Sequence, residues 1–226
     1  MERIILTTGG TGGHIFPALA VAEEIRRRNE RATILFMGGQ YGPEGDIAAK
    51  AGLDFVALPV RGVLGRGGKG LRAALGMVRG VRRALGVMRK FRPQLVLGFG
   101  GYAAFAGVLA GRLSGRKTAI HEQNSFPGMS NRLLGRMAHR IFLSLPDAAG
   151  AFPAARTVLV GNPVRADIAL LSERPPAEIP SKTRRSRLLV MGGSQGARAL
   201  NQGMLAAFPA LLEAEIDIWH QTGQAE

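Results

Sequence analysis

Short runs of β-branched and other apolar residues alternate with helical runs along this chain, and this alternation constrains its fold more than any other feature. Strands are expected at 3–8, 33–37, 54–58, 94–98, 117–121, 140–143 and 157–160. Helices are expected at 17–28, 44–51, 71–91, 102–113 and 129–137, with Pro17 at a first helical position that needs no amide donor. Strands that alternate with helices pair in parallel, so the pattern predicts an α/β fold with a helix-covered parallel sheet.

The pattern pauses after Gly161-Asn162-Pro163 and restarts near residue 187. Residues 166–186 are rich in proline, serine and charge, which is typical of a linker. A strand at 187–191, a glycine loop, a helix at 197–212 and a strand at 216–219 are expected to follow. One such unit has open sheet edges and too little core to stand alone. We therefore expect two domains, 1–162 and 163–226, with the second incomplete in this chain, and a boundary between Val160 and Arg187.

Three glycine-rich loops each follow an expected strand and open an expected helix: GGTGGH at 9–14, GFGGY at 98–102 and GGSQG at 192–196. Ligands of open α/β sheets bind at the carboxyl ends of the strands. Glycines there allow backbone amides to approach a phosphate, and the helix N-terminus adds partial positive charge. A single loop of this kind can be only a tight turn. Three in parallel settings favour phosphate or diphosphate binding.

Other nucleotide and metal motifs do not match. A dinucleotide-binding fingerprint needs glycine where Ile15 stands, and an acidic residue where the second strand runs into Gly38-Gly39. Gly68-Lys69-Gly70 lacks the hydroxyl of a P-loop, and His121-Glu122 has no second histidine four places on. The chain has no cysteine, which excludes disulfides and Cys-ligated zinc and fits a reducing cytoplasm. We expect no metal and no cofactor.

The net charge of +14 is concentrated in one stretch. No acidic residue lies between Asp54 and Glu122, where 13 basic residues occur. Within it, apolar residues recur at helical spacing: Leu71, Leu75, Val78, Val81, Leu85 and Met88. This pattern fits a solvated basic helix, or a basic amphipathic helix that, with the glycine-basic loop before it, attaches residues 61–92 to an anionic membrane surface. Few aromatic residues and no nucleic-acid module argue against nucleic acid as the partner, so we expect the membrane surface.

The uncharged stretch 93–111 is close to membrane-spanning length. It contains five glycines and divides into a strand, a turn and a small-residue helix, so we expect a buried strand-loop-helix. The N-terminal apolar run is too short for a secretory signal.

Five motifs, in this order, resemble the MurG family of UDP-N-acetylglucosamine-dependent transferases that act on lipid-linked muramyl-pentapeptide. They are GGTGGH with Phe16-Pro17, the run 98–102, His121-Glu122-Gln123-Asn124, the junction 161–165 and GGSQGA at 192–197. The resemblance implies a GT-B fold of two Rossmann-like domains and inverting transfer of N-acetylglucosamine from UDP-GlcNAc to the undecaprenyl-diphosphate acceptor in peptidoglycan synthesis. It also implies a peripheral enzyme at the cytoplasmic face of the cell membrane, with no obligatory metal.

The resemblance also implies roles for single residues. Thr11, Gly12 and Gly13 would line the cleft between donor and acceptor, and Tyr102 would shape the acceptor diphosphate site. Asn124 would contact the donor sugar.

Two further residues, Arg165 and Ser194, would lie in the donor diphosphate region. His14 is the best candidate for the general base that takes a proton from the acceptor hydroxyl, because imidazole suits that step near neutral pH. A helix-capping, structural role is the alternative for His14. For His121 we favour a structural role at the end of a strand.

The chain departs from the family in two places. Ala103-Ala104-Phe105 stands where the family usually has a small polar residue and a proline. We also expect the chain to end before the part of the second domain that would hold uracil and ribose. The alternative to an active transferase is therefore a catalytically incomplete acceptor-binding or membrane-scaffold fragment. Another GT-B transferase, with a lipid or polyphenol acceptor, fits the motifs less well.

Overall fold

The structure is a computed structural model that describes residues 2–61, 70–173, 186–193 and 196–223. The chain divides into two compact units, Met1–Glu173 and Arg174–Glu226.

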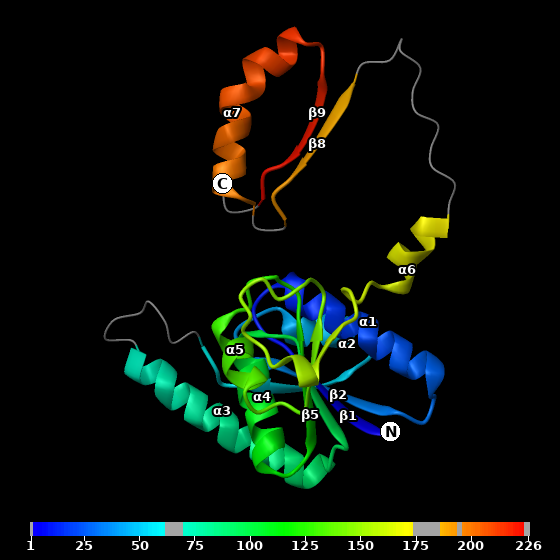
Figure 1. Ribbon diagram of the computed structural model, residues 1–226, viewed down its shortest axis with the longest axis vertical. Helices are drawn as coiled ribbons and strands as arrows, with labels where there is room; N and C mark the ends of the chain where they lie inside the picture. The colour runs from blue at the N-terminus through cyan, green and yellow to red at the C-terminus, as the bar shows by residue number, and fades with distance from the viewer. Residues whose placement is uncertain (1, 62–69, 174–185, 194–195, 224–226) are drawn as a thin grey trace. The chain divides into compact units, whose positions relative to one another are not determined.

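The first unit is built on a parallel sheet, in which β1, β2 and β5 are labelled in Figure 1. The sheet has seven strands in the order β3-β2-β1-β4-β5-β6-β7. The strands are β1 (Arg3–Thr7), β2 (Thr33–Gly39), β3 (Asp54–Leu58), β4 (Leu95–Gly98), β5 (Lys117–Glu122), β6 (Arg140–Leu143) and β7 (Thr157–Leu159). All seven lie where the sequence pattern predicts them, and every pair is parallel. The α/β expectation is confirmed.

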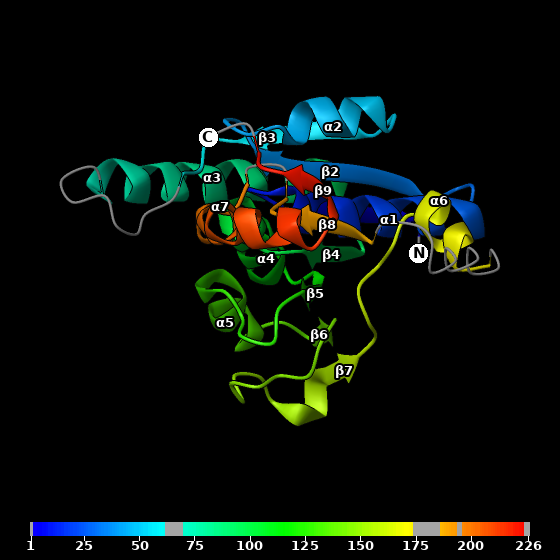
Figure 2. The same cartoon turned by 90° about the horizontal axis from the view of Figure 1, so that it is seen from above.

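Helices cover both faces of this sheet. They are α1 (Gly12–Arg28), α2 (Glu44–Lys50), α3 (Gly70–Phe91), α4 (Gly101–Leu113) and α5 (Met129–Gly135). Ile4 and Leu6 of β1 pack with α1 and α2 in one core cluster, whereas Ile5 packs with α3, α4 and α5 in the other. The side chains of a strand alternate between faces, so one strand supplies both cores. Figure 2 shows α3 and α5 on the other side of the sheet from α1.

The start of α1 differs from the prediction, because the helix begins at Gly12 and not at Pro17. The Thr11 carbonyl already accepts hydrogen bonds from the amides of His14 and Ile15, so the first turn forms directly from the glycine loop. Pro17 therefore lies inside the helix, where it has no N–H for the Gly13 carbonyl. This correction brings His14 into the first turn.

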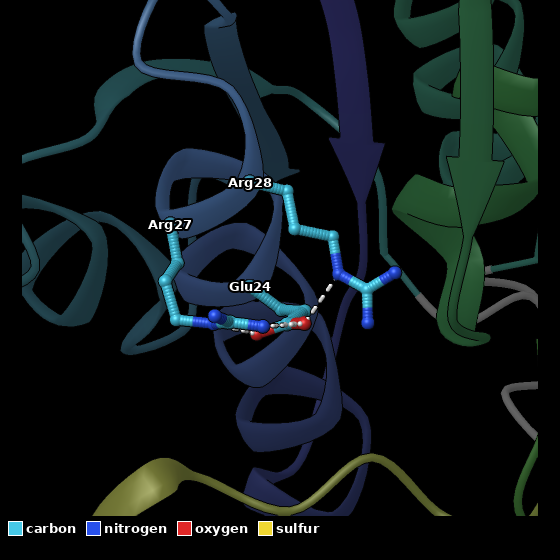
Figure 3. A network of polar contacts seen from close by, with 3 residues as sticks. All are labelled: Glu24, Arg27 and Arg28. Carbon is cyan, nitrogen blue, oxygen red and sulfur yellow. Dashed lines mark hydrogen bonds and ion pairs between the residues drawn. The ribbon is translucent and has the colours of Figure 1, made fainter.

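The exposed end of α1 carries a small ion-pair network (Figure 3). Arg27 Nε lies 2.7 Å and Arg28 Nε 2.5 Å from the Glu24 carboxylate. Hydrogen bonds from Arg27, and then from Arg28, lower the pKa of Glu24 to about 2. Because all three side chains face solvent, the network orders the helix surface rather than adding much stability.

The uncharged stretch 93–111 forms β4 and most of α4, and its alanines and valines are buried. The expectation of a buried strand-loop-helix is confirmed. Among the residues that the structure describes, no helix is long and apolar enough to cross a membrane.

Helix α3 buries only part of its apolar stripe, in which Val81 and Leu85 pack partly buried against the core. Ala73, Ala84 and Met88 are buried against the body, whereas Leu75 and Val78 are 49% and 57% exposed. Gly80 explains the difference, because a Cβ there would overlap with Val60. Small residues thus allow close packing of the helix and leave part of the predicted apolar stripe outside. The side chain of Leu71 and loop residues 62–69 lie outside the described residues.

The first part of the expected linker is helical, with α6 (Ala166–Ala169) and the 3-10 turn η3 (Leu170–Glu173). Asp167 in the first turn of α6 complements its positive N-terminus, which the proline-based linker prediction overlooked. Residues 174–185 lie outside the described residues. A second 3-10 turn, η2 (Ala154–Arg156), precedes β7.

The second unit contains β8 (Arg187–Met191), α7 (Arg198–Glu213) and β9 (Asp217–Gln221), with the two strands parallel. Strand, loop, helix and strand follow one another as predicted. Large apolar side chains such as Leu189, Leu205 and Trp219 are exposed. A two-stranded sheet with one helix cannot bury them by itself. The division at 162 remains a prediction.

Candidate functional site

The first two glycine loops meet at the carboxyl ends of β1 and β4. The Gly9 amide donates a hydrogen bond of 3.1 Å to the Gly100 carbonyl. Gly101 has a φ of +81°, and a Cβ there would overlap with the Gly9 carbonyl. Only glycine fits this close approach, which brings the N-termini of α1 and α4 to one place.

Two cavities open at this meeting point. One, of about 540 Å³, lies between the first loop and α2; the other, of about 480 Å³, lies between the second loop and α5. Both volumes are typical of small-molecule sites. His14, Gly101 and Tyr102 line both cavities, while Thr11 lines the first and Asn124 the second. The structure thus gathers four of the predicted polar and aromatic site residues around one centre.

His14 is held between the second glycine loop and β5. Its Nδ1 lies 2.9 Å from Gln123 Oε1. Gly100 lies against the ring, since a Cβ there would come 2.9 Å from His14 Cε1. The side chain therefore bonds to another loop and does not cap its own helix.

His121 and Gln123 lie behind His14. Gln123 Nε2 lies 3.0 Å from His121 Nδ1, and His121 Nε2 lies 3.1 Å from the Gly161 carbonyl oxygen. His121 is only 2% exposed, and this burial lowers its pKa despite the opposing effects of the Gly161 carbonyl and Glu122. The imidazole of His121 is therefore neutral near pH 7.

Glu122 orients Asn124 in the second cavity. Its Oε1 accepts hydrogen bonds of 3.0 Å from the Asn124 backbone amide and side-chain Nδ2, and its Oε2 accepts one from Asn131. Asn131 also donates to the His121 carbonyl, while its own buried Oδ1 has no hydrogen-bond partner among the described residues. A buried carboxylate with these donors fixes the loop rigidly. Glu122 belongs to the motif at 121–124, but nothing in the local pattern points to this orienting role.

Glu44 is a site residue that the sequence analysis missed. It is 2% exposed, lines the first cavity, and its Oε1 accepts a 3.0 Å hydrogen bond from the Gly10 amide. Gly38, Gly39 and Gly42 leave the space that its side chain fills. Those three glycines were the sequence feature that could have indicated a buried side chain at position 44.

The remaining predicted residues lie near the site or outside the described residues. Gly12 and Gly13 form the first turn of α1, with Gly12 against the Phe16 ring. The Arg165 guanidinium lies 5.4 Å from the centre of the same ring and 3.3 Å from Asp167. Ser194 lies outside the described residues. Within the described ranges, no group of three metal-binding side chains occurs.

Comparison with known families gives two matches. Residues 4–143 match the glycosyltransferase family 28 N-terminal domain, and residues 187–226 match the glycosyltransferase family 28 C-terminal domain. The first match covers β1 to β6 of the sheet, both cavities, His14 and Asn124, and ends before β7.

Two curated relatives with the same name are similar to this chain over nearly its whole length. The chain is 63% identical over all of its 226 residues to the UDP-N-acetylglucosamine--N-acetylmuramyl-(pentapeptide) pyrophosphoryl-undecaprenol N-acetylglucosamine transferase of Nitratidesulfovibrio vulgaris, of which it spans 61%. It is 45% identical to the protein of that name from Lawsonia intracellularis, over 98% of the chain and 60% of that protein. The chain thus spans about three-fifths of the length of these curated relatives.

Solved structures support the same fold. The crystal structure of Acinetobacter baumannii MurG aligns with a TM-score of 0.71 and 29% identity, covering 99% of this chain and 59% of that one. A putative UDP-N-acetylglucosamine 2-epimerase from Listeria monocytogenes aligns with a TM-score of 0.65 at 16% identity, over 99% of this chain and 64% of that one, and shows the fold alone.

Proposed function

This chain belongs to glycosyltransferase family 28, and on that premise we propose that it forms part of an inverting N-acetylglucosaminyltransferase. The donor is UDP-GlcNAc, and the acceptor is undecaprenyl-diphosphate-linked MurNAc-pentapeptide, so that lipid I becomes lipid II in peptidoglycan synthesis. The relatives named above carry this activity in their names.

The observation that supports this proposal most strongly is the position of the His14 side chain in the site. Its ring lies where the two cavities and the two glycine loops meet. An acceptor hydroxyl must lose its proton as it attacks the anomeric carbon, and imidazole is suited to take that proton near neutral pH. We propose His14 as this base, acting in one step that forms the new C–O bond and releases UDP.

The glycine loops supply the anion-binding part of the site. α1 and α4 both begin there, and their first turns carry no acidic residue. The amides at the start of a helix attract a diphosphate through hydrogen bonds and partial positive charge. We propose that Tyr102 and the second loop hold the acceptor diphosphate. Thr11, Gly12, Gly13 and Asn124 then face the reacting sugars, and Arg165 the donor diphosphate. The donor role of Ser194 stays a prediction from the sequence.

We also propose that α3 attaches the first unit to an anionic membrane surface. Leu75 and Val78 are exposed beside the exposed Arg79, Arg82 and Arg83. Exposed apolar side chains flanked by arginines match the pattern of helices that lie in a lipid interface. Phosphatidylglycerol vesicles should sediment the chain at low salt and less of it at high salt. Equal binding to neutral vesicles would contradict the electrostatic part.

The activity is tested on the complete protein, because this chain spans 61% of its relative. Labelled sugar from UDP-GlcNAc should appear in the lipid fraction only when the lipid-linked muramyl-pentapeptide is present. Labelled lipid without that acceptor, or none with it, would overturn the proposal. Sedimentation or lipid binding plays no part in this readout.

A catalytically incomplete acceptor-binding or membrane-scaffold fragment remains the second candidate for the 226 residues, since the chain spans 61% of its relative and matches the C-terminal family domain over 187–226 alone. Added UDP-GlcNAc should raise the melting temperature of a chain that binds donor. An unchanged melting temperature would favour the fragment.

A further inference from the structure

A chain of hydrogen bonds joins His14 to the backbone carbonyl of Gly161. Because this last group is a carbonyl, it determines which atom donates and which accepts at every other link of the chain. The chain of hydrogen bonds passes from His14 Nδ1 to Gln123 Oε1, from Gln123 Nε2 to His121 Nδ1, and from His121 Nε2 to the Gly161 carbonyl. The three distances are 2.9, 3.0 and 3.1 Å. These are ordinary hydrogen-bond lengths.

The Gly161 carbonyl can only accept, so His121 must carry its proton on Nε2. Ser144 agrees with this, because its hydroxyl donates to Asn162 and so presents a lone pair toward His121 Nε2, 3.4 Å away. Burial keeps His121 neutral, which leaves Nδ1 without a proton. His121 Nδ1 is therefore an acceptor.

The acceptor at His121 Nδ1 determines the orientation of the Gln123 side-chain amide. Its NH₂ group must point to His121, which turns its carbonyl oxygen to His14. An amide oxygen only accepts, so His14 must carry its proton on Nδ1 and keep the lone pair on Nε2. No hydrogen-bond partner for His14 Nε2 is found in the part of the chain that the structure describes.

We infer that Gln123 is a positioning residue that holds His14 in the Nδ1–H tautomer, with the basic Nε2 facing the cavities. The inference deepens the proposed function and rests on it for the role of the lone pair. Gln123 acts through His14 and takes no proton itself. His121, in turn, orients Gln123 and is held by the Gly161 backbone.

The other histidines provide internal controls. His139 Nδ1 accepts the Thr118 backbone amide at 3.1 Å, which places its proton on Nε2. Asn201 donates to the Thr222 carbonyl and presents Oδ1 to His220 Nε2 at 3.0 Å, which again places the proton on Nε2. Of the four histidines in the chain, His14 alone should be the Nδ1–H tautomer.

Nitrogen-15 NMR of the 226-residue chain tests the tautomers directly, because protonated and bare ring nitrogens have well-separated shifts. Above the histidine pKa values, His14 should show a protonated Nδ1, and His121, His139 and His220 a protonated Nε2. His14 with its proton on Nε2 would overturn the inference. This measurement needs no substrate, so its outcome is independent of whether the complete enzyme transfers sugar.

Two variants separate positioning from packing. Gln123→Met keeps the length of the side chain and removes both hydrogen bonds, whereas Gln123→Glu still accepts from His14 Nδ1. In the complete enzyme, Gln123→Met should lower kcat roughly 10- to 100-fold with a small change in donor KM, because His14 is free to adopt the wrong tautomer. Gln123→Glu should keep His14 in the Nδ1–H tautomer and retain most of kcat.

The outcomes are decisive in both directions. Full activity of Gln123→Met, with His14 still protonated on Nδ1, would show that Gln123 does not set the tautomer. Equal loss in both variants, with melting temperatures lowered in parallel, would assign Gln123 to packing alone.

Discussion

Gly101→Ala is the sharpest perturbation of the contact between the two glycine loops. A left-handed backbone costs a non-glycine residue about 1–2 kcal/mol. The new Cβ would also overlap with the Gly9 carbonyl, and overpacking of this kind costs about 1–3 kcal/mol. The free energy of unfolding of the first unit should therefore fall by about 2–5 kcal/mol.

Gly115→Ala is the matched control. Gly115 has a φ of +67°, and a Cβ there would meet nothing within 4 Å. The free energy of unfolding of Gly115→Ala should fall only by the backbone contribution of about 1–2 kcal/mol. Urea unfolding followed by far-ultraviolet circular dichroism is the suitable assay, because Trp219, the only tryptophan, lies in the second unit. Equal losses for the two variants would refute the close approach of the loops.

Three further predictions concern pH and chain organisation. Burial lowers the pKa of His121, so as the pH falls the unfolded chain takes up a proton on this imidazole before the folded chain does. The free energy of unfolding should therefore fall as the pH drops below 6.5. In urea titrations, His121→Gln should weaken this dependence of stability on pH. Glu24 should titrate near pH 2 by NMR and return toward 4.5 when Arg27 and Arg28 are replaced by Gln, and an unchanged midpoint would refute the ion pairs. Limited proteolysis should cut first between 160 and 187, whereas early cutting before 150 would contradict the proposed domain boundary.

The fold was predictable from the sequence because buried parallel strands and their helices leave a clear pattern. Strands β1, β2, β4 and β5 follow runs such as Ile4-Ile5-Leu6, whose side chains are buried on both faces of the sheet. The start of α1 was not predictable, because proline preference at a first helical position suggested Pro17. The amides of His14 and Ile15 found a partner in the Thr11 carbonyl instead.

The candidate site was only partly predictable. The glycine loops and His14 can be recognised in the sequence, because their chemistry depends on residues that are neighbours along the chain. The contacts that hold His14 do not, because Gln123 is 109 residues away in sequence. Glu44 depends in the same way on the distant amide of Gly10. Such contacts form only when the sheet brings the ends of its strands together.

The turnover of the complete enzyme with His14 replaced tests the central claim most directly. His14→Ala should lower kcat by roughly 100-fold or more, with a smaller change in donor KM, because loss of a general base has that effect. His139→Ala is the matched control, since that imidazole bonds to Thr118 away from both cavities, and it should keep kcat. A His14→Ala enzyme that turns over within a few-fold of the parent would contradict the account and place the base elsewhere.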